Sequence, residues 1–264
     1  MLRIHPRSLL LACLAVVLLA GPMTPTTAAQ EATPASGGLT ILSPDEEYGG
    51  ASLGEWEARN WQWAVSLPQE INPNFDPTGA TCGYGQSGPV FFLPASYTEE
   101  PPSDLTCVVP AGTALLVPVG GSECSTVEPP PFFGRDEAEL AACAEAFTDT
   151  IIAMEASIDG EPVPDLEQYR AVSPLFTMLF PEDNFFGVPA GVALSVADGY
   201  SFIIAPPPPG EYEISVSTQF EGDEGPLAVT MTVVVQEPQV IEPTASPESS
   251  PEAATPVASV SDSR

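Results

Sequence analysis

The chain has 264 residues, of which 44% are hydrophobic, and its 36 acidic residues against six basic ones give a formal net charge of −30. It contains no lysine, and its single histidine, His5, lies in the N-terminal leader described next, so the rest of the chain lacks the usual general base, imidazole metal ligand, Schiff-base amine and phosphate-binding lysine. This charge also excludes nucleic acid and anionic membrane surfaces as partners, because both bind proteins through basic patches.

The first 29 residues have the layout of a secretory signal peptide. Arg3 and Arg7 precede an apolar run over residues 9–20, and small residues lead to a predicted cleavage site after Ala29. This run is shorter than the roughly 20 residues that a membrane-spanning helix needs. A bacterial lipoprotein site at Cys13 is the alternative, but the apolar run continues past this cysteine. The leader predicts a secreted or cell-surface protein.

One domain is expected over residues 39–235. Residues 30–38 and 236–264 are rich in Pro, Ser, Thr, Ala and Glu, a composition that cannot bury enough apolar surface to fold, so they are predicted to be a disordered spacer and a disordered tail. The stretch between them is long enough to form a hydrophobic core. Because acids far outnumber its arginines, we expect internal ion pairs rather than an anion-binding clamp at Arg59, Arg135 and Arg170.

Two α-helices are predicted in this domain. Ser52 and Glu55 have the spacing of a capping box, apolar residues then recur at helical spacing over 53–67, and Pro68 ends the pattern. A second helix is predicted over 136–150, because acidic residues occupy its first turn and apolar residues share one face.

One stretch between these helices resembles a calcium-binding loop. Oxygen-bearing side chains alternate at Asn72, Asn74, Asp76 and Thr78, as in an EF-hand. However, proline stands where that loop needs glycine, and glycine stands where it needs its last glutamate. Calcium is therefore considered but not favoured over a simple turn, and we expect no cofactor.

The remaining segments predict β-strands at residues 89–93, 105–109, 114–119 and 152–158. Residues over 212–218 and 227–235 alternate in polarity, which indicates antiparallel strands with one buried face. A Pro-Gly turn ahead of residue 212 is typical of late strands in immunoglobulin-like domains. We therefore expect a mainly β fold, namely an antiparallel β-sandwich with an immunoglobulin-like C-terminal part and with the two helices packed on or beside it.

Four cysteines lie beyond the leader, at Cys82, Cys107, Cys124 and Cys143. An even number in an exported chain with no histidine to complete a metal site predicts two disulfides. Of the three pairings that are open, we favour Cys82 with Cys107 and Cys124 with Cys143, because each bond then closes a local loop. A four-thiolate zinc site is the alternative, but such sites usually have two close cysteine pairs.

Four segments carry distinctive motifs: WEARNWQWAVSLP (56–68), NPNFDPTGATCGYGQSGPVFFLP (72–94), CVVPAGTALLVPV (107–119) and DGYSFIIAPPPPGEYEISV (198–216). With their W-x-W-x-x-S-x-P and C-x-x-G-Q-x-G-P-V-x-F-L patterns, they resemble a family of uncharacterised secreted bacterial proteins. Members often have Trp at the positions of Asn60 and Phe91 and His at that of Tyr212, so a histidine-dependent role there could not carry over. The resemblance implies one exported, disulfide-bonded, β-rich unit and no activity.

The candidate ligand-binding residues are Trp56, Trp61 and Trp63, which lie close to Glu55 and Glu57. Carboxylates beside aromatic rings are typical of glycosidases, so a carboxylate-dependent polysaccharide hydrolase is the alternative function. Residues two apart on a helix point in different directions, so Glu55 and Glu57 cannot form the catalytic pair by themselves. We expect a non-catalytic extracellular binding or structural module, with a glycan or a protein as the open partner classes.

Overall fold

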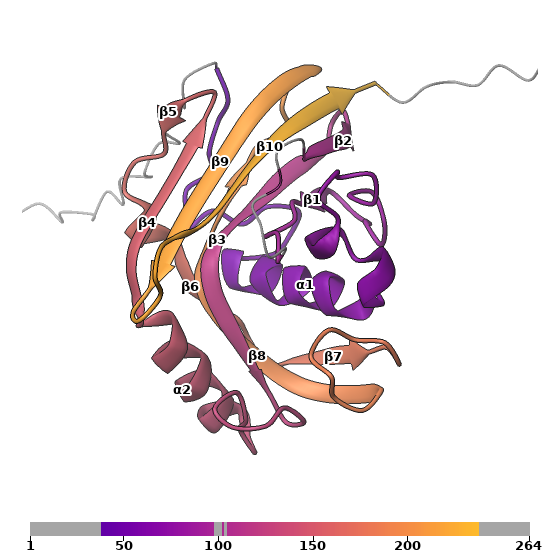
Figure 1. The fold of residues 1–264 in the computed structure, drawn as a ribbon. Coiled ribbons are helices and arrows are strands. Elements are labelled where there is room, and N and C mark those ends of the chain that lie inside the picture. The colour runs from indigo at the N-terminus through magenta and orange to yellow at the C-terminus, as the bar shows by residue number, and fades with distance from the viewer. Residues whose placement is uncertain (1–37, 98–101, 103–104, 238–264) are drawn as a thin grey trace, which may run out of the picture. The chain divides into compact units, whose positions relative to one another are not determined.

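The described part of the chain is mainly β, with ten strands in two sheets and two α-helices (Figure 1). The computed structural model describes residues 38–97, 102 and 105–237. It confirms the mainly β composition and the two helices that the sequence predicts. The predicted signal peptide lies outside the described residues, and so do the spacer apart from Gly38 and the tail apart from Gln236 and Glu237.

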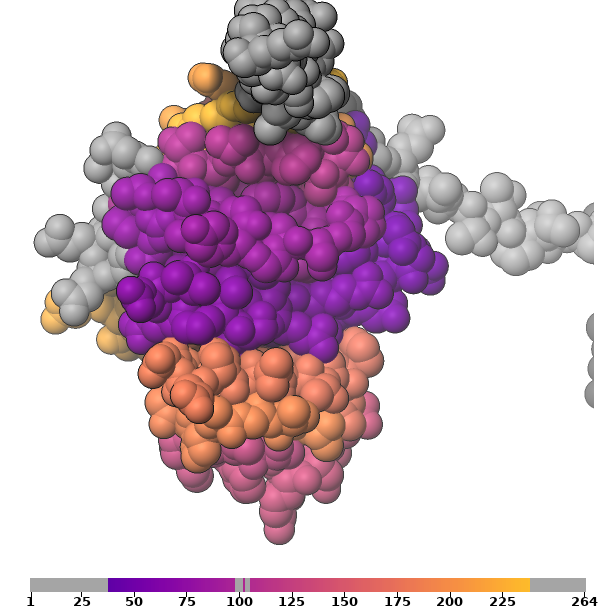
Figure 2. Space-filling view, turned by 90° about the vertical axis from the view of Figure 1, so that its right-hand side faces the viewer, coloured from indigo at the N-terminus to yellow at the C-terminus, as the bar shows by residue number. Residues whose placement is uncertain are grey.

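Helix α1 (Leu53–Ser66) starts at the predicted capping box. The hydroxyl of Ser52 accepts the backbone N–H of Glu55 at 3.3 Å, and the Glu55 carboxylate accepts the backbone N–H of Ser52 at 2.8 Å. The apolar face of the helix packs against β7 and β8, and in Figure 1 it lies beside the long strand β3. Figure 2 shows this side of the molecule, where α1 and the segments after it form a continuous layer above β7 and β8.

The first sheet has the order β1-β3-β8-β6, and β7 also pairs with β8. Its strands are β1 (Val90–Phe92), β3 (Ala114–Ser125), β6 (Arg170–Val172), β7 (Phe176–Phe180) and β8 (Gly191–Ile204). The β1–β3 pair is parallel and the other pairs are antiparallel.

The second sheet has the order β2-β10-β9-β4-β5. Its strands are β2 (Thr106–Pro110), β4 (Ile151–Ile158), β5 (Glu161–Pro162), β9 (Gly210–Phe220) and β10 (Leu227–Gln236). The β2–β10 pair is parallel and the other pairs are antiparallel.

The expected antiparallel sandwich differs from the structure because each sheet is mixed. β1 and β3 can run in the same direction because the chain between them crosses to the other sheet as β2. β2 meets its own parallel neighbour, β10, only near the end of the described chain. The immunoglobulin-like character of the C-terminal part stays a prediction.

Helix α2 (Glu137–Thr148) and two disulfides complete the framework. Cys82–Cys107 ties the loop before β1 to β2, and Cys124–Cys143 ties β3 to α2, which confirms the favoured pairing. Short 3-10 turns lie at Gln69–Ile71 (η1), Pro73–Phe75 (η2) and Leu166–Tyr169 (η3). Within the described ranges, neither helix is long and apolar enough to cross a membrane.

Candidate functional site

A cavity of about 450 Å³ lies over the middle of β3. In Figure 1, β3 passes between α1 on one side and the hairpin of β9 and β10 on the other, and residues of all four elements line the cavity. Much of its wall is aromatic: Trp61, Phe75, Tyr97, Phe132, Phe147, Phe185, Phe186, Tyr200 and Phe220. A concave and mainly apolar site of this size suits a small organic molecule.

Glycines at the β3–β8 contact make room for this cavity. The register of the two strands shifts between Pro118 and Gly120. A Cβ at Gly121 would lie 2.4 Å from the Cα of Gly199, so the two backbones approach more closely than other residues allow. A Cβ at Gly199 would lie 3.2 Å from Oε1 of Glu57. The glycines thus create the space into which the Glu57 carboxyl projects from α1.

Glu57 is one of three buried carboxyl groups that line the cavity. Glu57 is 4% exposed, and Ser201 Oγ donates a hydrogen bond to Oε2 of Glu57 at 2.7 Å. Burial raises the pKa of Glu57, and the nearby charge of Asp198 raises it further, although hydrogen bonding from Ser201 and Trp61 acts in the opposite direction. Glu57 is therefore an acid that ionises less readily than an exposed glutamate.

The other two carboxyls, Glu123 and Glu128, form a pair. They are 2% and 6% exposed. Ser195 donates to Oε2 of Glu123 at 2.6 Å, and Ser125 donates to Oε2 of Glu128 at 2.8 Å. Burial raises the pKa of both groups, and the charge of Glu128 adds to the increase at Glu123. Because the two groups are neighbours, ionisation of one opposes ionisation of the other.

Three further polar groups point toward the same cavity. Asn60 is 8% exposed, and its Oδ1 has no hydrogen-bond partner; the indole N–H of Trp61 also lacks a well-formed hydrogen bond, although it lies near Glu57. Tyr97 is 41% exposed as a residue, but burial of its hydroxyl, followed by the charges of Glu57 and Glu123, raises its pKa. Buried polar groups without partners are rare in folded proteins, so the unpartnered Oδ1 of Asn60 and Oε1 of Glu123 indicate a site for a ligand.

No arginine of the described chain lines this cavity. Arg170 donates to both oxygens of Asp198 and lies 2.8 Å from Asp149, and Arg135 pairs with Glu139. The expected internal ion pairs are therefore confirmed for these two arginines. The guanidinium carbon of Arg59 lies 4.3 Å from the centre of the Trp56 ring. The carboxyls of the cavity consequently have no cation of the described chain against them.

The three predicted tryptophans do not share one site. Trp61 lines the cavity, whereas Trp56 and Trp63 pack against Phe92 in the core. The indole N–H of Trp56 donates to the carbonyl of Tyr48 at 2.9 Å, and that of Trp63 donates to the carbonyl of Tyr84 at 2.8 Å. Ligand binding by all three stays a prediction, and the cavity concerns Trp61 alone.

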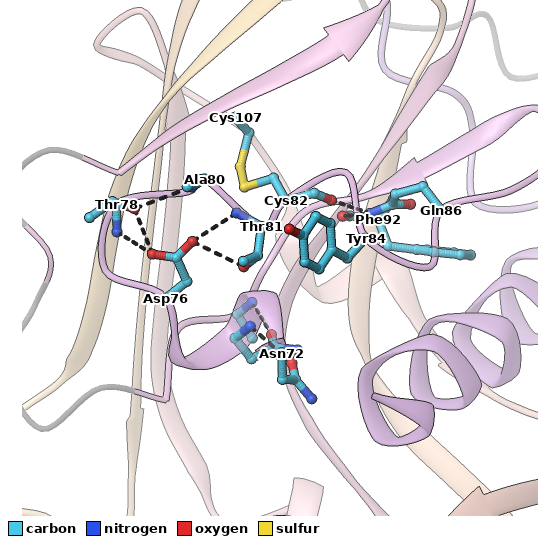
Figure 3. The surroundings of a disulfide bond; sticks show 12 residues. Asn72, Asp76, Thr78, Ala80, Thr81, Cys82, Tyr84, Gln86, Phe92 and Cys107 are labelled. Carbon is cyan, nitrogen blue, oxygen red and sulfur yellow. Dashed lines mark hydrogen bonds between the residues drawn. A yellow bond between two sulfur atoms is a disulfide. The ribbon is translucent and has the colours of Figure 1, made fainter. Parts of the chain in front are cut away.

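The calcium-like stretch is held by hydrogen bonds of its own (Figure 3). Thr78 and Thr81 each donate a backbone N–H and a hydroxyl to the Asp76 carboxylate. Burial opposes ionisation of Asp76, but these four hydrogen bonds outweigh it and lower its pKa to about 2. Asn72 donates to the Ala64 carbonyl at 2.6 Å. The described residues contain no group of three or more acids or cysteines that could hold a metal ion.

Sequence reasoning considered Glu57 only beside Glu55 and the tryptophans. It did not place Glu57 in one site with Glu123, Glu128, Tyr97 and Asn60. Glu123 follows Gly120 and Gly121, and this run looks like a turn in the sequence although it is the second half of β3. The sequence did contain one signal for Glu123, because this acid lies between a pair of glycines and a cysteine. Glycine inside a strand marks a close approach of another backbone.

No known family model and no curated protein matches the sequence. A cysteine protease inhibitor from Entamoeba histolytica aligns with 50% of this chain and 86% of its own, at 10% identity and a TM-score of 0.20. PbICP-C, solved in complex with falcipain-2, aligns with 56% of this chain and 100% of its own, at 13% identity and a TM-score of 0.22. Such low scores support no assignment, and the resemblance to secreted bacterial proteins stays a prediction.

Proposed function

We propose that this chain is a non-catalytic extracellular binding module that holds a small organic ligand in the cavity over β3. The observation that carries the proposal is an aromatic-walled cavity of about 450 Å³ with unpartnered polar groups directed into it. The two disulfides support an extracellular location, because such bonds persist in oxidising compartments. The ligand can be a free molecule, or it can be a sugar unit of a glycan or a side chain of a protein that enters the cavity.

A carboxylate-dependent polysaccharide hydrolase is the second candidate. In its favour, Glu57 and Glu123 line one aromatic cavity, and each has a raised pKa, as a general acid requires. Against it, hydrolysis by two carboxyls needs one that stays ionised as base or nucleophile. Burial raises the pKa of Glu128 as well, so without a cation beside it none of the three acids has the lowered pKa that favours this second role.

A ligand screen on the full chain tests the proposal. A library of small amines, alcohols, acids and oligosaccharides is scored by thermal shift for binding and by reducing-end release for cleavage. Ala95→Trp places an indole in the half-buried position of Ala95, which lines the cavity, whereas Ala142→Trp adds an indole to an exposed position of α2 as a matched control.

We expect compounds that raise the melting temperature of the wild type and of Ala142→Trp, but not of Ala95→Trp, and we expect no sugar cleavage. Hits that shift all three proteins equally, or a screen without hits, would overturn the cavity as the binding site. Cleavage of an oligosaccharide that is lost in Glu57→Gln would favour the hydrolase instead.

A further inference from the structure

Among the polar groups of the cavity, hydrogen-bond acceptors outnumber hydrogen-bond donors. Ser201 and Ser195 each satisfy one oxygen of a carboxyl, Oε2 of Glu57 and Oε2 of Glu123. Neither Oε1 of Glu123 nor Oδ1 of Asn60 has a hydrogen-bond donor. A ligand that fits these groups must bring N–H or O–H donors.

The carboxyl groups of the site can carry only negative charge. Glu57, Glu123 and Glu128 are buried acids, and no arginine of the described residues lines the cavity with them. An anionic ligand would be repelled and would have to be desolvated, whereas a cation would neutralise a carboxylate and form charge-assisted hydrogen bonds with it. Aromatic rings line the same cavity, and the face of such a ring also attracts a cation.

We propose that the ligand is a small organic cation, a primary ammonium group on an apolar body, with the ammonium against Glu57 and Glu123 and the apolar body against the aromatic wall. The three N–H donors of an ammonium match the acceptors at Glu57, Glu123 and Asn60. The apolar body accounts for the rings of Phe75 and Phe185, whose centroids lie 5.1 Å apart beside the site. This inference rests on the proposed function and specifies its ligand class.

Titration of the site follows from the groups that face one another across it. These are Glu57 from α1, Tyr97 from the loop after β1, Glu123 from β3 and Glu128 from the segment after it, with Asp198 of β8 behind Glu57 and paired with Arg170. An ammonium ligand stabilises the ionised carboxylates, so its affinity must fall as the pH is lowered and these acids become protonated.

The test compares three probes of similar shape and different charge: phenethylammonium, phenethyl alcohol and phenylacetate. Binding to the full chain is measured by isothermal titration calorimetry at neutral pH. We expect phenethylammonium to bind about 10- to 100-fold more tightly than the alcohol, because a hydrogen bond to a charged group is stronger than a neutral one, and we expect no binding of phenylacetate. The ammonium affinity should also drop between about pH 8 and about pH 4, and that of the alcohol should not.

Matched variants locate the effect. Glu123→Gln and Glu57→Gln keep the side-chain shape, and each should weaken phenethylammonium about 10-fold while leaving the alcohol unchanged. Glu145→Gln removes one charge from an exposed position of α2 and should change neither affinity. Thermal melts identify folded variants, and two independent substitutions keep the test open if one fails to fold.

Equal or tighter binding of the alcohol, or an ammonium affinity that does not change with pH, would overturn the organic cation while leaving the cavity as a binding site. Loss of ammonium binding in Glu145→Gln as well would show that the acidic surface, rather than the cavity, attracts the probe, and would overturn the inference. Absence of any hit in the wider screen described above would overturn the proposed function itself.

Discussion

Replacing Arg170 with methionine should destabilise the protein strongly, because it leaves a buried carboxylate without its cation. Nε of Arg170 lies 3.1 Å from both oxygens of Asp198, and Nη2 lies 2.6 Å from Oδ2. The Asp198 side chain is 0% exposed. Removing one partner of a buried ion pair costs about 3–5 kcal/mol. Because the Arg170 side chain is 29% exposed and water can reach the gap, we expect the lower end, about 3 kcal/mol.

Urea unfolding at fixed salt, followed by tryptophan fluorescence, measures this loss. Arg135→Met is the matched control: its pair with Glu139 is exposed, so its loss should change the free energy of unfolding little. The double variant Arg170→Met/Asp198→Asn removes both charges and should recover about half of the lost free energy of unfolding. If Arg170→Met costs no more than Arg135→Met, the reasoning from burial is wrong.

Three further predictions concern other parts of the fold. Replacing Cys82 and Cys107 together with serine opens a loop with a sequence separation of 25, which should lower the free energy of unfolding by about 3.5 kcal/mol in urea titrations. Hydrogen bonds hold the pKa of Asp76 at about 2 against the opposing effect of burial, so its stabilisation is present above about pH 4 and lost as the pH falls toward 2. Asp76→Asn should therefore lose about 1 kcal/mol near neutral pH and much less near pH 2, where Asp76 is about half protonated in the folded state, and an equal loss at both would contradict this. Gly79→Ala should cost about 1–3 kcal/mol more than Gly112→Ala in thermal melts, because both have a positive φ, +81° and +83°, but only at Gly79 does a Cβ meet a carbonyl oxygen of β2, at 2.3 Å.

Local features of the fold were accessible from the sequence. The capping box at Ser52 and Glu55 fixes the start of α1, and Asp136 caps α2 as its acidic first turn suggests. The alternation over β9 and β10 predicts both strands, because each has one buried face. The favoured disulfides also follow from proximity in the chain.

The sequence did not predict the features that arise where a strand or helix is covered on both faces. β8 is buried along most of its length between neighbours that include α1 and α2, so it has no alternation to reveal it. The role of Glu57 was hidden for a related reason. Helical spacing separates it from Glu55, but its burial depends on Gly199 and Ser201, which lie on β8 far along the chain. No local pattern encodes such a contact.

The position of β10 inside the second sheet constrains the order in which the domain assembles. β10 lies between β2 and β9, and its residue Val233 pairs with Cys107, a separation of 233 − 107 = 126 residues. Until β10 arrives, β2 and β9 each have an unpaired edge, which is a hazard for aggregation. Closing so long a loop is slow. The β2–β10 and β9–β10 pairings therefore cannot form until β10 has been synthesised, and the acidic charge of the chain opposes association through the open edges until then.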